Sequence, residues 1–76
     1  MTNTLEFKSI MVKRGLTLKK LSNLIGISNT TLSYKINNKR EFTSSEIKAL
    51  QEVLNLNEEE REIIFFAEKV DLKSTS

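Results

Sequence analysis

Five positions in the chain carry the residue pattern that begins an α-helix, and they divide its 76 residues into short segments. The five positions are Asn3, Thr17, Ser28, Thr43 and Asn57. Each side chain can accept a hydrogen bond from an unpaired amide of the first helical turn. Three of the five are followed three residues later by glutamate, the spacing of a capping box. Because the chain also lacks proline, we expect an all-α fold of five short helices without strands.

Within these segments the apolar residues recur at the spacing of one helical face. The first helix is expected near residues 4–14, a helix-turn-helix at about 17–37, and a C-terminal helix at about 58–70. Residues 1–72 then form a single domain, and the tail 73–76 is expected to fray. The expected core residues are Phe7, Ile10, Leu16, Leu21, Ile25, Leu32, Phe42, Ile47 and Leu50.

The segment 28–40 reads SNTTLSYKINNKR and is much more polar than the segments on either side. Gly26 permits a sharp turn before it, and Ile27 places an apolar side chain between two helices. Leu32 and Ile36 fall on one face of the following helix, so they can hold it against the core. Amide, hydroxyl and phenol groups then occupy its outward faces, and such a helix can meet base edges in a major groove.

Charge is divided unequally along the chain. Residues 1–40 contain eight basic residues and one acidic residue, a net charge of +7. Residues 41–76 contain four basic and nine acidic residues, a net charge of −5. A charge run is usually a solvated face, but here the basic half also contains the polar helix. We therefore expect a polyanionic partner.

Several classes of function are disfavoured by composition. Cysteine and histidine are both absent, which removes disulfides, zinc sites and the commonest proton-transferring side chain. No cofactor or small-molecule ligand is indicated, and an enzyme acting through the carboxylates of Glu58–Glu60 is a remote reading. No apolar run is long enough to span a bilayer, and no secretory signal opens the chain. We expect a cytoplasmic protein.

The stretch GLTLKKLSNLIGISNTTLSYKINNKREFTSSEIKAL resembles the lambda-repressor-like helix-turn-helix family, which includes the Cro and repressor proteins of phages. The resemblance covers roughly residues 5–56. It depends on the combination of buried, small and turn residues at matching positions, since any one of them alone is weakly specific. The matching residues are Leu21, Ser22, Ile25, Gly26, Ile27 and Leu32.

The resemblance implies a recognition helix that begins at Asn29. Asn29 can pair with adenine through two hydrogen bonds, whereas Tyr34 can reach a base, a sugar or a phosphate. The turn after this helix and the start of the second helix would hold the DNA backbone. The implied base contacts are Asn29, Thr30, Ser33 and Tyr34. The implied phosphate contacts are Lys19, Lys20, Ser28, Thr31, Asn37, Asn38, Lys39 and Arg40.

The sequence departs from the family pattern at two places. Leu18 stands where many members have a glutamine that bonds a phosphate and braces the recognition helix. Met11 and Ile36 stand where many members have a buried arginine and glutamate pair. An apolar pair at that place is at least as stabilising as an ion pair of similar volume.

The fifth helix has more apolar residues than one face requires. Ile63, Phe66, Ala67 and Val70 form one stripe, expected to pack on the core. Ile64 and Phe65 lie off that stripe, so they are either possible dimer contacts or part of a helix buried on two sides. A twofold dimer through this helix would predict a palindromic operator.

These features together predict a sequence-specific double-stranded-DNA-binding regulator of phage or prophage Cro or repressor type. It would act by occupying an operator in a bacterial host, where it would be nucleoid-associated when bound. The alternative is a protein-interaction module on the same fold, such as an antirepressor or an antitoxin-like adaptor. Salt-dependent binding to duplex DNA distinguishes the two, because only DNA binding releases counterions from phosphates.

Overall fold

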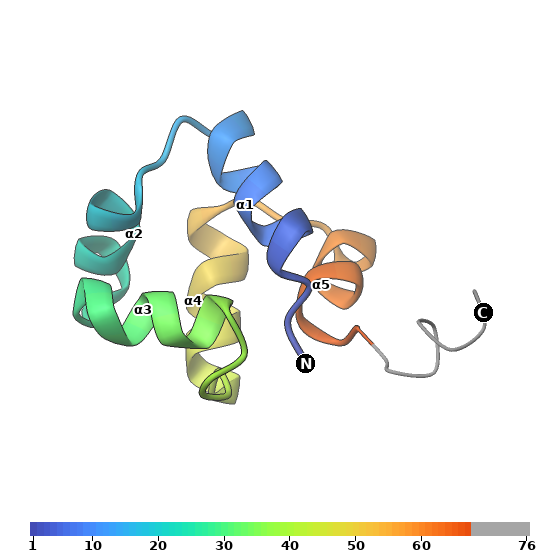
Figure 1. Ribbon diagram of the computed structural model, residues 1–76. Coiled ribbons are helices and arrows are strands. Elements are labelled where there is room, and N and C mark those ends of the chain that lie inside the picture. Colours follow the sequence, from blue (N-terminus) through green and yellow to red (C-terminus); the bar gives the residue numbers. More distant parts are fainter. Residues whose placement is uncertain (68–76) are drawn as a thin grey trace.

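The computed structural model describes residues 1–67, and that part of the chain contains five α-helices and no strand (Figure 1). They are α1 (Thr4–Lys13), α2 (Leu18–Ile25), α3 (Asn29–Ile36), α4 (Ser44–Val53) and α5 (Glu58–Phe65). The prediction of an all-α, five-helix fold is confirmed. The two short helices of the predicted helix-turn-helix are α2 and α3.

All five helices begin where the capping pattern predicts. In each case the side-chain oxygen of the capping residue accepts a hydrogen bond from the amide three residues later. Thr43 with Glu46, and Asn57 with Glu60, form complete capping boxes in which the glutamate carboxylate also accepts from the capping residue's amide. These bonds are local in sequence, which is why a short pattern is enough to predict them.

Four helices end in one backbone arrangement, which after α2 consists of Gly26, with φ 78°, and a 3.1 Å bond from the Ile27 amide to the Ser22 carbonyl oxygen. Gly15, Asn38 and Asn55 have positive φ angles of 68°, 66° and 54° after α1, α3 and α4. The amide of each following residue donates to the carbonyl oxygen five residues earlier, as in a Schellman motif. These bonds run from Leu16 to Met11 (2.9 Å), from Lys39 to Tyr34 (2.8 Å) and from Leu56 to Gln51 (2.9 Å).

One hydrophobic core joins the five helices, with α2 packed on α3 and α4, and α1 packed on α5. Phe7 lies at its centre, because its ring stacks on Phe42 and meets Phe65 edge to face, each at 5.8 Å between centroids. All nine expected core residues belong to this core. Phe7, Ile10, Leu21, Leu32 and Leu50 are buried, and Leu16, Ile25, Phe42 and Ile47 are partly buried against it.

The predicted faces of α5 were wrong. Ile64 and Phe65 are buried, only 3% and 4% exposed, whereas Ile63 and Phe66 are 47% and 44% exposed. Phe65 is drawn inward because it completes the aromatic cluster with Phe7 and Phe42. Ile64 and Phe65 are therefore core residues and are not available as dimer contacts.

The end of α5 also differs from the expectation. The helix ends at Phe65, not at residue 70, because Phe66 leaves the helical region with φ −123° and ψ 35°. The amide of Ala67 then donates to the carbonyl oxygen of Met1 at 3.1 Å. Residues 68–70 of the expected helix, and the tail 73–76, lie outside the described residues.

An ion pair between α3 and the first turn of α4 supplements the core. Lys35 is only 6% exposed, and its ammonium donates to both carboxylate oxygens of Glu46, at 2.6 and 2.8 Å. Burial alone would raise the pKa of Glu46. The hydrogen bonds from Lys35 and from the Thr43 amide outweigh burial and hold that pKa below its usual value.

We expect Glu46→Gln to lower the free energy of unfolding by about 2 kcal/mol at pH 7, because it leaves the Lys35 ammonium buried without a carboxylate. Since the folded-state pKa of Glu46 is lowered, its contribution is complete above the unfolded pKa and is lost as the pH falls through the folded one. Thermal unfolding followed by circular dichroism between pH 7 and pH 3 measures both effects. Glu62→Gln is the control, because that carboxylate is 60% exposed and pairs with Arg61 only at 3.4 Å. Equal melting temperatures for the two variants would contradict this role of the pair.

Candidate nucleic-acid interface

The third helix presents one polar side to solvent and buries the other. Leu32 and Ile36 are 0% and 2% exposed, so they anchor α3 in the core. Asn29 and Thr30 are exposed, Ser33 is half-buried, and Tyr34 is 45% exposed. All four predicted base contacts therefore retain solvent-accessible surface, and none is buried in the core.

Asn29, the first residue of α3, is braced by the preceding helix. The Ser22 hydroxyl of α2 is buried and donates its proton to the Asn29 side-chain oxygen. The same proton is shared with the Lys19 carbonyl oxygen. This contact orients the Asn29 amide group. The second lone pair of the side-chain oxygen and the side-chain N–H groups stay available to a base. Leu18, which replaces the family's bracing glutamine, is half-buried against the core. Bracing of α3 is therefore supplied by Ser22.

The two hydroxyls at the start of α3 are hydrogen-bonded to each other. The Ser28 hydroxyl oxygen accepts from the Thr31 amide at 3.1 Å and donates to the Thr31 hydroxyl at 2.9 Å. Ser28 is thus used first as the N-cap. The Thr31 hydroxyl proton can still be donated outward, so of these two predicted phosphate contacts Thr31 is the better donor.

The turn after α3 carries two exposed cationic side chains, Lys39 and Arg40. The Lys39 ammonium lies 5.9 Å from the centroid of the Tyr34 ring, within the range of a cation–π contact. Asn37 is exposed, and its side-chain amide donates to the Ser33 carbonyl oxygen at 2.9 Å. The Lys39 ammonium is therefore held beside the exposed side of α3.

Asn38, which is predicted to contact phosphate, forms two side-chain hydrogen bonds with a residue of its own chain. Its side-chain oxygen accepts from the amide of Thr2, and its side-chain nitrogen donates to the Thr2 carbonyl oxygen, both at 2.8 Å. These two bonds tie the amide group to the N-terminal segment, although Asn38 itself is exposed. The phosphate contact stays a prediction for this residue, whose side chain is held by a partner 36 positions away in sequence.

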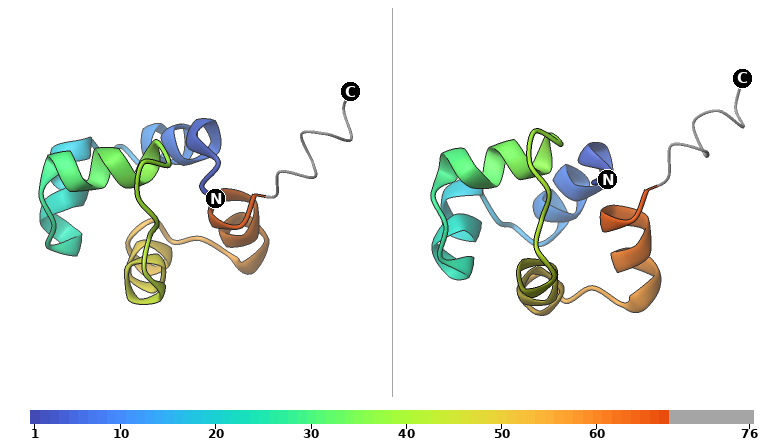
Figure 2. Two further views of the ribbon diagram at one scale, coloured as in Figure 1. Left: turned by 60° about the horizontal axis from the view of Figure 1, so that its bottom comes forward. Right: turned by 90° about the horizontal axis from the view of Figure 1, so that it is seen from below.

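The start of α2 offers a second set of cations, Lys19 and Lys20, which are both exposed. In Figure 2, α2 and α3 lie together at one end of the molecule, and α5 lies at the other. The acidic first turn of α5, Glu58–Glu60, is therefore remote from the candidate interface. The carboxylates of that turn are therefore kept away from the surface that carries α3.

Two basic residues of the first half serve the fold, and sequence reasoning did not assign them. Lys35 forms the buried pair with Glu46, and its position between Leu32 and Ile36 on the inner side of α3 was the available signal. Arg14 donates to the carbonyl oxygens of Leu54 and Asn55, at 2.8 and 3.4 Å, and so caps the end of α4. No sequence signal indicated that contact.

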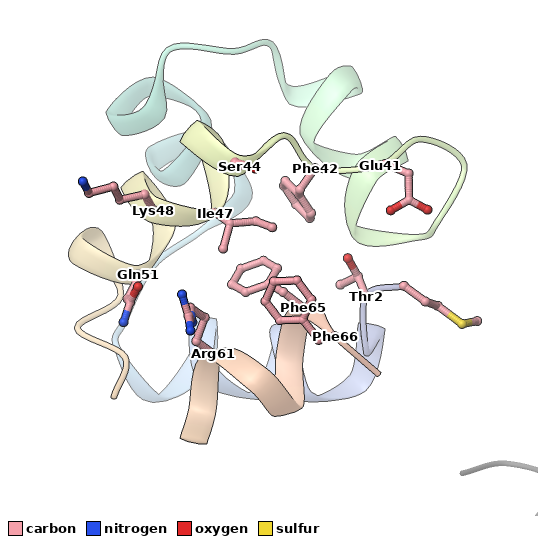
Figure 3. A pocket seen from close by; sticks show the side chains of 11 residues that line it. Thr2, Glu41, Phe42, Ser44, Ile47, Lys48, Gln51, Arg61, Phe65 and Phe66 are labelled. Carbon is pink, nitrogen blue, oxygen red and sulfur yellow. The ribbon is translucent and has the colours of Figure 1, made fainter. Parts of the chain in front are cut away.

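A hollow of about 500 Å³ lies between α4 and α5, with aromatic rings on its wall (Figure 3). Its lining includes Phe42, Phe65 and Phe66 but no residue of α2 or α3, so it is separate from the candidate interface.

Within residues 1–67 there is no group of three or more acidic, histidine or cysteine side chains able to hold a metal ion. Nor does any helix of that region combine the length and apolar composition needed to cross a membrane.

Comparison with known proteins identifies a family. The family model described as helix-turn-helix matches residues 7–61, which include α2, α3, α4 and most of α1. Searches of curated proteins and of solved structures gave no match. The match covers more than half of the chain and the same residues that carry the resemblance seen in the sequence. This chain therefore belongs to the lambda-repressor-like helix-turn-helix family of DNA-binding transcription regulators.

Proposed function

We propose that the protein is a sequence-specific regulator of Cro or repressor type, of phage or prophage origin, that acts by occupying an operator and obstructing polymerase. The observation that supports this most is the exposed polar side of α3, with Leu32 and Ile36 buried beneath it. In this proposal α3 enters the major groove, where each base pair presents a distinct set of donors and acceptors.

Sequence reading is assigned to Asn29, Thr30, Ser33 and Tyr34. Asn29 is suited to adenine, because its amide group is already oriented by Ser22 and a bidentate pair discriminates against a wrong base by about 1–3 kcal/mol. Thr30 and Ser33 can contact a thymine methyl group or a single acceptor. Tyr34 lies nearest the turn, under the Lys39 ammonium.

Backbone contacts are assigned to cations on either side of α3. Lys19 and Lys20, with the first amides of α2, would hold one DNA strand, and Lys39 and Arg40 would hold the other. Thr31 and Asn37 would add neutral donors, and Ser28 would do so by turning its hydroxyl proton from Thr31 to a phosphate. Such contacts set the register of α3 in the groove but carry no sequence information themselves.

A twofold dimer is part of the proposal. The α5 segment leaves two large apolar side chains half-exposed, Ile63 and Phe66, and a second copy of the chain would cover them. Recognition helices in such a dimer lie about 34 Å apart, one turn of DNA. The expected operator is therefore an inverted repeat.

Replacing a base-reading side chain should reduce specificity. We expect Asn29→Ala and Tyr34→Ala each to weaken binding to the selected operator about 5-fold to 100-fold while changing binding to random duplex much less. Fluorescence anisotropy measures the dissociation constant for the selected operator and that for the random duplex. Asn23→Ala, at an exposed asparagine of α2, is the control. Equal losses on operator and random DNA would remove the residue from the base-reading set.

Replacing a phosphate-binding cation should act on all duplexes alike. With about five phosphates neutralised, the slope of log affinity against log salt is near −4.5, and Lys39→Ala should make it shallower by about one unit. Lys48→Ala removes the same charge from an exposed site on α4 and should leave the slope unchanged. A wild-type chain whose interaction with DNA has no salt dependence would favour the protein-adaptor alternative.

Placing a charge on the exposed face of α5 should separate the dimer. We expect Ile63→Asp and Phe66→Asp to convert a dimer into a monomer in sedimentation equilibrium, while Leu5→Asp, on an α1 side chain that is 80% exposed, does not. Selection from a random duplex pool should yield an inverted repeat with the wild-type chain and half-sites with the α5 variants. A wild-type chain that remains monomeric at about 100 μM and selects an asymmetric site would contradict the dimer.

A further inference from the structure

Residues 1–4 form a strap that links α5 to the end of α3 (Figure 1). On the α5 side, the Asn3 amide donates to the Ile64 carbonyl oxygen at 2.6 Å, and the Met1 carbonyl oxygen accepts from Ala67. On the α3 side, the Thr4 hydroxyl donates to the Ile36 carbonyl oxygen at 2.7 Å. The strap therefore fastens the last turn of α3 to an element at the other end of the molecule.

The strap also contacts the turn that follows α3. The contact is made by Thr2, which is only 7% exposed. Its amide and its carbonyl oxygen are both bonded to the side chain of Asn38. Thr2 also lies on the wall of the hollow beside α5 (Figure 3), so the side chain of the exposed Asn38 is bonded to a buried residue. Two bonds to one amide group fix its orientation as well as its distance from Thr2.

The backbone of Asn38 sets the direction in which the chain leaves α3. With φ +66°, it reverses the chain, and its amide donates to the Lys35 carbonyl oxygen at 3.3 Å. The next amide, that of Lys39, donates to the Tyr34 carbonyl oxygen at 2.8 Å. Lys39 and Arg40 follow directly. One residue thus joins the recognition helix, the cationic turn and the strap.

We infer that Asn38 is a positioning residue for DNA binding, acting through its bonds to Thr2. By fastening the turn to the strap it fixes Lys39 and Arg40 relative to the exposed side of α3, so that both cations meet phosphates while α3 lies in the groove. This inference rests on the proposed function. It differs from a direct phosphate contact, in which an N–H of the Asn38 side chain would itself be donated to the DNA.

The chain contains a matched control at Asn55. Asn55 occupies the same left-handed position after α4 and is followed by the same backbone bond, from the Leu56 amide to the Gln51 carbonyl oxygen. Within residues 1–67 no hydrogen bond is formed by the Asn55 side chain, although its backbone carbonyl accepts from Arg14. Glycine tolerates positive φ, so Asn→Gly at either site keeps the turn and removes only the side chain.

The test compares Asn38→Gly with Asn55→Gly. We expect Asn38→Gly to weaken binding to the selected operator about 10-fold and to make the salt slope shallower, because Lys39 and Arg40 are no longer held in place. We expect Asn55→Gly to bind like the wild type. Circular dichroism confirms that both variants remain helical. Wild-type affinity for Asn38→Gly would overturn the inference.

A double-mutant cycle separates positioning from direct contact. If Asn38 acts through the two cations, Asn38→Gly has little further effect in a chain that already carries Lys39→Ala and Arg40→Ala. If Asn38 binds phosphate itself, its 10-fold loss persists in that background, and the inference is overturned.

Amide hydrogen exchange of the free protein gives a readout that does not depend on DNA. The Thr2 amide should be protected in the wild type and in Asn55→Gly, and should exchange faster in Asn38→Gly. An unprotected Thr2 amide in the wild type would overturn the inference while leaving DNA binding intact. A wild-type chain with a protected Thr2 amide that binds no duplex would instead overturn the proposed function, and with it the role of Asn38 in binding.

Discussion

Burial of Leu32 and Ile36 is the interaction on which the candidate interface depends. These two side chains hold an otherwise polar helix against the core, and Lys35, between them in sequence, adds the ion pair with Glu46 on the same inner side. An eight-residue helix in water has little stability of its own, so its form and its orientation both come from these tertiary contacts. The outward polar side chains of α3 can therefore be committed to a partner, because the anchoring of the helix does not require them.

The same residue type has different roles at different places in this chain. Asn3 and Asn57 cap helices through their side-chain oxygens, whereas Asn38 and Asn55 follow helices in the left-handed conformation. Asn29 is exposed at the start of α3, where Ser22 orients its amide group. What distinguishes these residues is the partner of each side chain. Among these asparagines, all within residues 1–67, only Asn38 has both a left-handed backbone and a side chain bonded to a distant partner, Thr2. This is why it connects local structure to the placement of the cationic turn.

Formal charge overstates the cationic surface of the first half of the chain. Lys35 is neutralised by Glu46, and Arg14 is directed to the carbonyl oxygens at the end of α4. The exposed cations assigned to the DNA backbone, Lys19, Lys20, Lys39 and Arg40, come from the start of α2 and from the turn after α3. Because salt screens exposed charges over roughly 8–10 Å, local placement of these groups matters more for DNA than the net charge of +2.

The sequence by itself determined the five helix starts, the turn at Gly26, the anchoring of α3 through Leu32 and Ile36, and the family. These features depend on contacts within a few residues or on helical periodicity, both of which a short pattern records. Only the tertiary structure decided which side of α5 is buried, that Lys35 pairs with Glu46, and that the Asn38 side chain binds Thr2. Phe65 is buried because its ring packs against the rings of Phe7 and Phe42. The Asn38 side chain bonds Thr2 because the strap passes beside it. Such choices depend on partners brought together by folding from distant parts of the chain, and no local pattern encodes them.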